Sequence, residues 1–324
     1  MTKAQLRLTI AAVIVLVAAF LAFRLLSMWG DLGDAPALER PGLIAPGLAL
    51  YAATLLTFAL LWRSVMRRLD PARPSALDSI AVFCASWLGR YVPSSLPYFA
   101  GKFAMGMRLG HGKPALAASM LYENVIIVSV GAFGSAVVIP LVLAGRGGPP
   151  LFLGAGVVGV AGLLLLSPPF FHRLVSLATR VTGRAPVARE SLLSYRGIVV
   201  ASALAAVSMV LNGAGFALIL SAFVDLSATE LVASAAIFNL AGAVGVMVLP
   251  LPSGLGVREA VLIGLLQFYV PVEIAAAAAV VIRLGGLGVD LLFGVAGAGL
   301  FALRQRHPDV SETPLPQRQL DAAA

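Results

Sequence analysis

Apolar runs long enough to cross a membrane take up most of the chain, and they restrict the folds that it can adopt. Several of them exceed the roughly 18 residues that indicate a membrane-crossing helix. Charged residues make up only 12% of the chain, about half of the share in a soluble domain. Because every backbone polar group in lipid must be satisfied within its own segment, long apolar runs cross as helices. The sequence therefore predicts an all-α polytopic membrane protein.

Six segments are predicted as full spans. They lie near residues 8–29, 43–62, 115–144, 150–170, 197–222 and 272–303. The first is predicted to be a retained span, because its apolar run is longer than that of a signal peptide. The spans and their short connections use nearly all of the chain, so we expect one integral membrane domain over 1–306. The polar, proline-containing segment 307–324 is expected to be a disordered cytoplasmic tail.

Two further apolar regions, 76–113 and 228–271, are each broken in the middle by proline and glycine. Each region is either one kinked span or a re-entrant hairpin that enters and leaves the membrane by the same face. The residues predicted to form the bends are Pro93, Pro97, Gly101, Pro252, Gly254 and Gly256.

The distribution of loop arginines and lysines favours hairpins over kinked spans. With two hairpins, nearly all of these residues lie on the cytoplasmic side, and only Arg40 and Arg146 lie outside. If 76–113 crossed once, the basic segment 172–196 would move to the outside. We therefore expect about six full spans plus two re-entrant helical hairpins in a cell membrane, with both termini in the cytoplasm.

A weak internal similarity relates the two parts of the chain. Segment 115–123 can be laid over 275–283, and the Pro97–Gly101 spacing recurs at Pro252 and Gly256 at nearly the same offset. The halves, about 1–146 and 147–306, would begin on opposite sides of the membrane. An inverted repeat whose broken helices meet near the midplane is typical of transporters.

Charged side chains stand inside the apolar segments, where each costs about 2.5–3.5 kcal/mol at the bilayer centre. These residues are Arg90, Lys102, Glu123, Arg258, Glu259, Arg283 and Asp290. The basic ones outnumber the acidic ones, and arginine keeps its proton when it is buried. Helix N-termini at the bends would add positive charge. The pattern predicts a buried substrate-binding site for an anion such as a lipid phosphate.

A purely structural role explains some of these charged residues better than others. Asp290 follows Arg283 by two helical turns and could belong only to an internal ion-pair network. Arg90 and Lys102 would reach the cytoplasmic interface if the first hairpin were shallow. For Arg258, Glu259 and Arg283 a purely structural role is hardest to argue, so the functional interpretation is favoured for these three.

The segment LPLPSGLGVREAVL over 249–262 resembles a signature in the flippase (transmembrane) domain of lysylphosphatidylglycerol synthetases. RYVPSSLPYFAGKFAMGMRLG over 90–110, followed by ALAASMLYE over 115–123, resembles the first-half pattern of the same family. The resemblance covers nearly the whole chain. It implies an inverted-repeat bundle with re-entrant hairpins and movement of lipid between leaflets without lipid synthesis. A stand-alone member without the aminoacyltransferase domain is expected.

The resemblance also implies roles for particular residues. It assigns a second-hairpin site to Pro252, Gly254, Gly256, Arg258 and Glu259, and a first-hairpin site to Arg90, Pro93, Gly101 and Lys102, with Glu123 and Arg283 in the helices that follow. Ser253, the Ser94–Ser95 pair and Lys102 depart from the family pattern. These departures leave the preferred headgroup open.

The expected function is a flippase that moves an anionic or phosphate-containing glycolipid or phospholipid between leaflets of the cytoplasmic membrane. Its partners would be membrane lipids with anionic headgroups, with a lipid-synthesising enzyme as a further candidate. No enzymatic activity, cofactor, metal site or nucleic-acid partner is expected. An exporter of a soluble anionic metabolite and a non-transporting scaffold for a lipid-modifying enzyme remain alternatives. An intramembrane glycosyltransferase is disfavoured, because neither a reactive acid pair nor a DxD motif near a loop is found.

Overall fold

A computed structural model describes residues 36–92, 96–142, 151–165, 167, 169–170, 173, 192–247, 254 and 256–306. Regular structure in this part of the chain is helical throughout, which confirms the all-α prediction. The helices are η1 (Pro41–Leu43), α2 (Ile44–Leu69), α3 (Ala76–Trp87), η2 (Leu88–Tyr91), α4 (Leu96–Arg108), α5 (Lys113–Val142), α6 (Leu151–Leu165), α8 (Tyr195–Leu220), α9 (Ala228–Met247), α10 (Val257–Leu266) and α11 (Val272–Arg306).

Four predicted spans are confirmed as long apolar helices. They are α2, α5, α8 and α11, each long and apolar enough to cross a membrane. The predicted span 150–170 contains α6, which covers 15 of its residues, and the residues that border α6 on either side lie outside the described part of the chain. The predicted span 8–29 and the tail 307–324 lie outside the described residues. The protein is therefore an all-α polytopic membrane protein.

Hydrogen bonds between helix ends define the two ends of the bundle. At one end Asp70, just after α2, accepts from the backbone N–H of Gly112 at 2.8 Å, and Arg304 near the end of α11 donates to Asp78 of α3. At the other end the N–H of Arg40 donates to the carbonyl of Ala222, just after α8. These are called the Asp70 end and the Arg40 end below.

The first predicted hairpin is confirmed as two short helices, α3 and α4, joined through η2. The Ser75 side chain caps α3 by accepting from the N–H of Asp78. The hairpin starts and ends at the Asp70 end of the bundle. Its two helices have 12 and 13 residues, so each is only about 20 Å long. At Gly89 an added Cβ would stand 2.3 Å from the backbone nitrogen of Tyr98, so the close approach of the two legs requires glycine here.

The predicted bend residues of this hairpin occupy different places in the structure. Pro97 and Gly101 lie in the first turns of α4, after the bend rather than in it. Proline is tolerated in the first turn of a helix, since its missing N–H would have no helical partner there. Pro93 lies outside the described residues.

The second hairpin consists of α9 and α10, and its legs are unequal. Ser227 and Glu230 form a capping box at the start of α9, at the Arg40 end. α9 has 20 residues and is long enough to cross a membrane, unlike the ten-residue α10. The chain returns to the same end, because the Ser234 hydroxyl near the start of α9 lies 3.0 Å from the Tyr269 hydroxyl just after α10. The break is confirmed, and its first leg is longer than expected.

Glycine shapes the described part of the second bend. Gly254 and Gly256 have φ of 68° and 84°, a left-handed region that strains other residues. An added Cβ at Gly254 would stand 2.7 Å from the Cα of Gly245 in α9, so the bend packs directly on the preceding helix. Pro252 lies outside the described residues.

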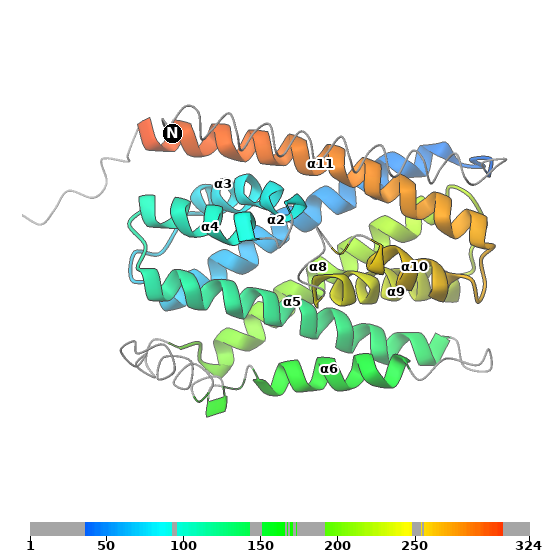
Figure 1. Ribbon diagram of the computed structural model, residues 1–324, viewed down its shortest axis with the longest axis horizontal. Coiled ribbons are helices and arrows are strands. Elements are labelled where there is room, and N and C mark those ends of the chain that lie inside the picture. The colour runs from blue at the N-terminus through cyan, green and yellow to red at the C-terminus, as the bar shows by residue number, and fades with distance from the viewer. Residues whose placement is uncertain are drawn as a thin grey trace, which may run out of the picture.

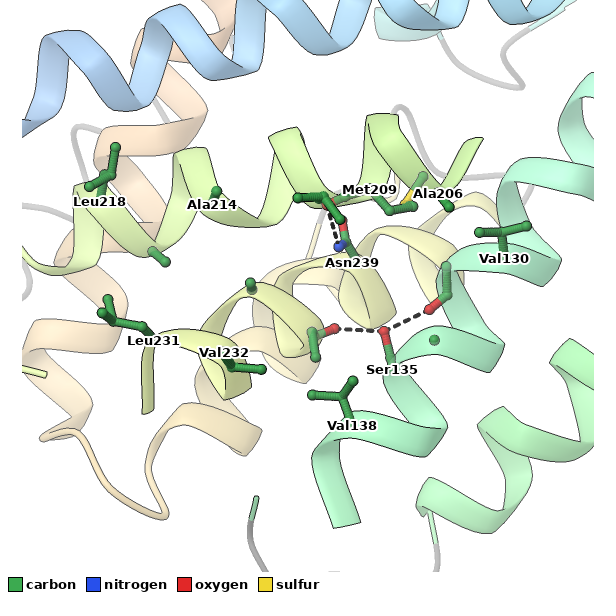
Figure 2. Close-up of a pocket in the computed structure, with 16 residues that line it drawn as sticks. Val130, Ser135, Val138, Ala206, Met209, Ala214, Leu218, Leu231, Val232 and Asn239 are labelled. Carbon is green, nitrogen blue, oxygen red and sulfur yellow. Dashed lines mark hydrogen bonds between the residues drawn. The ribbon is translucent and has the colours of Figure 1, made fainter. Parts of the chain in front are cut away.

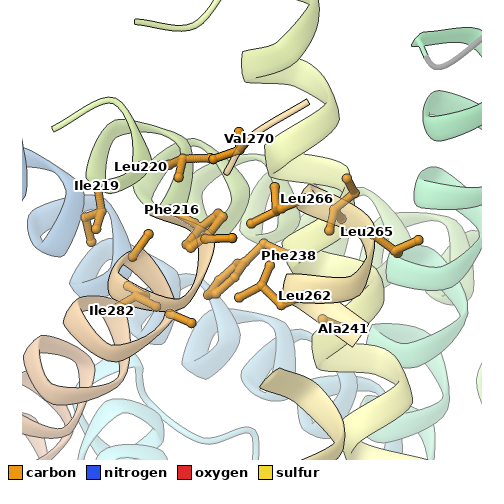
Figure 3. Close-up of a cluster of buried hydrophobic side chains, with 14 of the residues drawn as sticks. Phe216, Ile219, Leu220, Phe238, Ala241, Leu262, Leu265, Leu266, Val270 and Ile282 are labelled. Carbon is orange, nitrogen blue, oxygen red and sulfur yellow. The ribbon is translucent and has the colours of Figure 1, made fainter. Parts of the chain in front are cut away.

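The hairpins occupy opposite halves of the molecule, with α3 and α4 on the left of Figure 1 and α9 and α10 on the right. A cluster of buried side chains fixes the second hairpin against α8 and α11 (Figure 3). At its centre the rings of Phe216 and Phe238 stack with centroids 4.4 Å apart. Leu262 and Ile282 extend this cluster onto α10 and α11. The packing therefore holds the start of α10 against α9 and α11.

Candidate functional site

The two hairpins meet at a small cavity between them and the spanning helices α2 and α11. Its lining comes from η2, α9 and α10 as well as from the two spans. Four of the seven predicted charged residues line it: Arg90, Arg258, Glu259 and Arg283. The structure therefore brings together residues that are up to 193 positions apart in the sequence (283 less 90).

Arg258 lies in the first turn of α10, directly after the glycine bend. Its guanidinium stands 4.5 Å from the centroid of the Phe238 ring on α9. Among the described residues, no carboxylate lies within ion-pair distance of this guanidinium. The aromatic face stabilises the charge without using the hydrogen-bond donors of the guanidinium.

Glu259 binds the bend and α11 at once. One carboxylate oxygen accepts from the backbone N–H of Gly256 at 2.7 Å, which satisfies a donor at the start of α10. The other oxygen lies 3.4 Å from Nε of Arg283. Glu259 therefore fixes the second hairpin and orients the Arg283 side chain at the cavity.

Arg90 brings a third guanidinium to the cavity from the first hairpin. It lies at the end of η2, and its guanidinium stands 4.2 Å from the centroid of the Trp87 ring. The neighbouring Tyr91 also lines the cavity. The tip of each hairpin therefore supplies one arginine that lies over an aromatic ring.

Asp290 lies behind the cavity lining and holds the first hairpin in place. Its buried carboxylate accepts from the Tyr51 hydroxyl at 3.0 Å, from Nε1 of Trp87 at 3.1 Å and from the Tyr91 hydroxyl at 2.5 Å. These donors come from α2, α3 and η2. Asp290 thus links α11 to the first hairpin and to α2 through neutral hydrogen-bond donors.

Lys102 and Glu123 form a separate pair and do not line the cavity. Nζ of Lys102 lies 2.5 Å from Oε2 of Glu123, and the two side chains are 0% and 1% exposed. The Tyr98 hydroxyl accepts from Lys102 at 3.0 Å and donates to the other Glu123 oxygen at 3.1 Å. The rings of Trp62 and Phe83 also lie against the ammonium group. This pair fastens α4 to α5.

The charges around the cavity leave an excess of positive charge. Arg90, Arg258 and Arg283 face Glu259 and, behind the lining, Asp290. Arginine does not lose its proton on burial, and an uncompensated buried charge is strongly unfavourable. The site is therefore complementary to one anionic group. Its volume of about 20 Å³ holds no more than about one water molecule, so a phosphate can enter only if the hairpin tips move apart.

Aromatic residues of the site were missed by the sequence reasoning. Tyr51, Trp87, Tyr91 and Phe238 either line the cavity or orient its charges. Two features of the sequence could have pointed to them: a tyrosine in the apolar run 43–62 and another directly beside Arg90. Ring contacts between separate helices could not be derived from these positions alone.

Comparison with known proteins identifies the family of the chain. A family model described as the lysylphosphatidylglycerol synthase TM region matches residues 6–294. A search of curated proteins finds no significant match. The matched range contains both hairpins and every residue that lines the cavity. The chain belongs to the family of lysylphosphatidylglycerol synthase transmembrane regions.

Proposed function

We propose that this protein moves an anionic or phosphate-containing lipid between the leaflets of the cell membrane. The observation that supports it best is the cavity lined by Arg90, Arg258 and Arg283, which come from both hairpins and α11. Guanidinium groups bind phosphate oxygens through paired hydrogen bonds. A site with excess positive charge inside a membrane bundle suits a lipid phosphate on its way across.

The arrangement of the hairpins supports access from either side. Each hairpin starts and returns at its own end, and their tips meet at the cavity. We infer an inverted repeat, in which withdrawal of one tip opens the site to one leaflet and withdrawal of the other opens it to the opposite leaflet. No covalent chemistry is assigned to the acids, since Glu123, Glu259 and Asp290 each bind neighbouring donors.

The proposed orientation places the Asp70 end in the cytoplasm. Arg67, Arg108, Lys113 and Arg304 lie on helix segments at this end. Positive residues are enriched in short cytoplasmic loops and at the adjoining span ends. Both termini are proposed to be cytoplasmic, with membrane lipids as the principal partners and a lipid-synthesising enzyme as a further candidate.

Lipid exchange in vesicles tests the proposal. Purified protein is reconstituted with headgroup-labelled phosphatidylglycerol, and a membrane-impermeant quencher reports the label that reaches the outer leaflet. Wild type is expected to accelerate the exchange, and Arg258→Gln and Arg283→Gln are expected to slow it by at least about tenfold, because each removes a charge-assisted contact of roughly 1.5–3 kcal/mol. Arg67→Gln, at an exposed site on α2, is the matched control.

Two other outcomes would favour a different function for the protein. Folded wild type that exchanges no labelled lipid but takes up a soluble phosphate ester would favour an exporter of anionic metabolites. Folded wild type that moves neither compound would favour a scaffold. In both cases the lipid-transport proposal would fail.

A further inference from the structure

A second and much larger hollow lies between α5 and α8, with α9 along its floor (Figure 2). Its lining runs over Val130–Val138 of α5, Ala206–Leu218 of α8 and Leu231–Asn239 of α9, with residues three or four positions apart on each helix. The volume is about 610 Å³. It is called the α5–α8 groove below.

The lining of the α5–α8 groove is apolar. Its polar side chains, Ser135 and Asn239, are already hydrogen-bonded within the protein. The Ser135 hydroxyl lies 2.6 Å from the carbonyl oxygen of Gly131 and 2.7 Å from that of Ala236. The Asn239 amide donates to the carbonyl of Met209 and accepts from Asn212, both at 2.8 Å. The groove therefore suits a hydrocarbon ligand rather than a headgroup.

The dimensions of the groove match one leaflet. The twelve-residue step from Ala206 to Leu218 rises about 18 Å along a helix, and half of a hydrocarbon core is about 15 Å. The groove begins beside Asn239, inside the bundle, and runs toward the Arg40 end, where α8 finishes and α9 starts. Val210 and Val232 of its lining are 69% and 52% exposed, so it opens on the outer surface of apolar helices.

One helix separates the groove from the arginine cavity. Phe238 of α9 lines the cavity and lies against Arg258, whereas the next residue, Asn239, lines the groove. The two sites therefore share a wall near the inner end of the groove. We propose that the α5–α8 groove binds one acyl chain of the transported lipid, in the leaflet at the Arg40 end. This inference rests on the proposed function, and it adds a site for the chain to the site for the phosphate.

Gly134 offers a way to fill the groove without disturbing the fold. It lines the groove on α5, and an added Cβ there meets no heavy atom within 4 Å. Gly134→Leu places a branched side chain in the space proposed for the acyl chain. Gly299 on α11 has the same open surroundings and does not line the groove, so Gly299→Leu is the matched control.

Photocrosslinking detects the chain directly. Phosphatidylglycerol that carries a diazirine in one acyl chain is added to the full-length protein in vesicles, and the adducts are mapped by mass spectrometry. The expected adducts concentrate on the groove faces of α5, α8 and α9. Gly134→Leu should reduce the number of these adducts about tenfold, because it would exclude about two methylene groups of the acyl chain from the groove. Gly299→Leu should leave the number of adducts unchanged.

Lipid exchange by the same variants separates this inference from the proposed function. Gly134→Leu should also slow the exchange of headgroup-labelled phosphatidylglycerol, and Gly299→Leu should not. If wild type exchanges lipid while adducts spread evenly over the lipid-facing helices and ignore Gly134→Leu, the acyl-chain site is overturned and lipid transport stands. If adducts concentrate in the groove but wild type exchanges no lipid, lipid transport is overturned, and the claim that the chain belongs to a transported lipid fails with it.

Discussion

The charged residues inside the apolar segments differ in what surrounds them. Arg90, Arg258 and Arg283 line a cavity, whereas Lys102 and Glu123 neutralise each other in a sealed site. A charge inside the membrane is costly, so all of these positions were candidates from sequence. Which charges pair and which line the cavity depends on how α4, α5, α10 and α11 pack together. That information is tertiary, and no residue spacing in the chain carries it.

Removal of one member of the Lys102–Glu123 pair should destabilise the protein more than removal of both. Lys102→Met leaves the Glu123 carboxylate buried without its cation, a change that costs about 3–5 kcal/mol. In Lys102→Met/Glu123→Gln no charge is left, and most of that loss should be recovered. Thermal unfolding in detergent measures both variants against wild type. A double variant less stable than the single one would contradict a charge-pair role.

The hairpins were predictable as broken segments because proline and glycine interrupt apolar runs. Their boundaries were not. Pro97 fits the first turn of α4, so it does not mark the bend, and α9 continues to Met247. The contact of Gly89 with the opposite leg depends on how α3 and α4 pack, so the sequence did not identify this glycine.

Gly89→Ala should disrupt the first hairpin. The new Cβ would lie 2.3 Å from the backbone of Tyr98, which cannot move as a flexible side chain would. Overpacking of this kind costs about 1–3 kcal/mol or more. The predicted result is a lower unfolding midpoint and slower lipid exchange. Gly299→Ala, in open surroundings, is the control, and equal behaviour of the two variants would refute the tight packing.

Cysteine labelling should show that each hairpin returns to its own side. In a Cys84→Ala background, cysteines at Leu77 and Met107 mark the ends of the first hairpin, and cysteines at Thr229 and Phe268 mark the ends of the second; all four positions are exposed. A membrane-impermeant thiol reagent should label the second pair in intact cells and the first pair only after permeabilisation. Labelling of Leu77 and Met107 from opposite sides would show that this segment crosses the membrane.

At the scale of the whole molecule, ion pairs connect segments that are distant in the sequence at both ends of the bundle. Arg40 pairs with Asp225 at one end, and Arg304 pairs with Asp78 at the other. Between the ends lies a cavity too small for a phosphate. The described conformation is therefore closed around the site, and the proposed transport would require the hairpin tips to move apart. The span pattern predicted a membrane protein, but only the packed hairpins show where its interior charges meet.

The contribution of the Asp78–Arg304 contact to stability should not change with pH above about pH 8. Burial disfavours the Asp78 carboxylate, but hydrogen bonds from Arg304 and Ser75 outweigh it and hold the pKa of Asp78 below its usual value. The ionised Asp78 carboxylate then makes its full contribution to stability above the ordinary aspartate pKa of about 3.9. That contribution is lost as the pH falls through the lower pKa of Asp78 in the folded state. Unfolding midpoints of wild type and Asp78→Asn should differ by a constant amount between about pH 8 and 9. A difference that changes within that range would contradict this account.

The central claim is that the arginine cavity recognises a phosphate on a lipid. The most direct test compares the exchange of two headgroup-labelled lipids with the same acyl chains, phosphatidylglycerol and an uncharged glycosyl diacylglycerol, in vesicles that contain wild type or Arg258→Gln. Wild type should accelerate phosphatidylglycerol well above the uncharged lipid, and Arg258→Gln should remove that difference. Equal acceleration of both lipids by wild type, or an unchanged preference in Arg258→Gln, would contradict recognition of phosphate by this site.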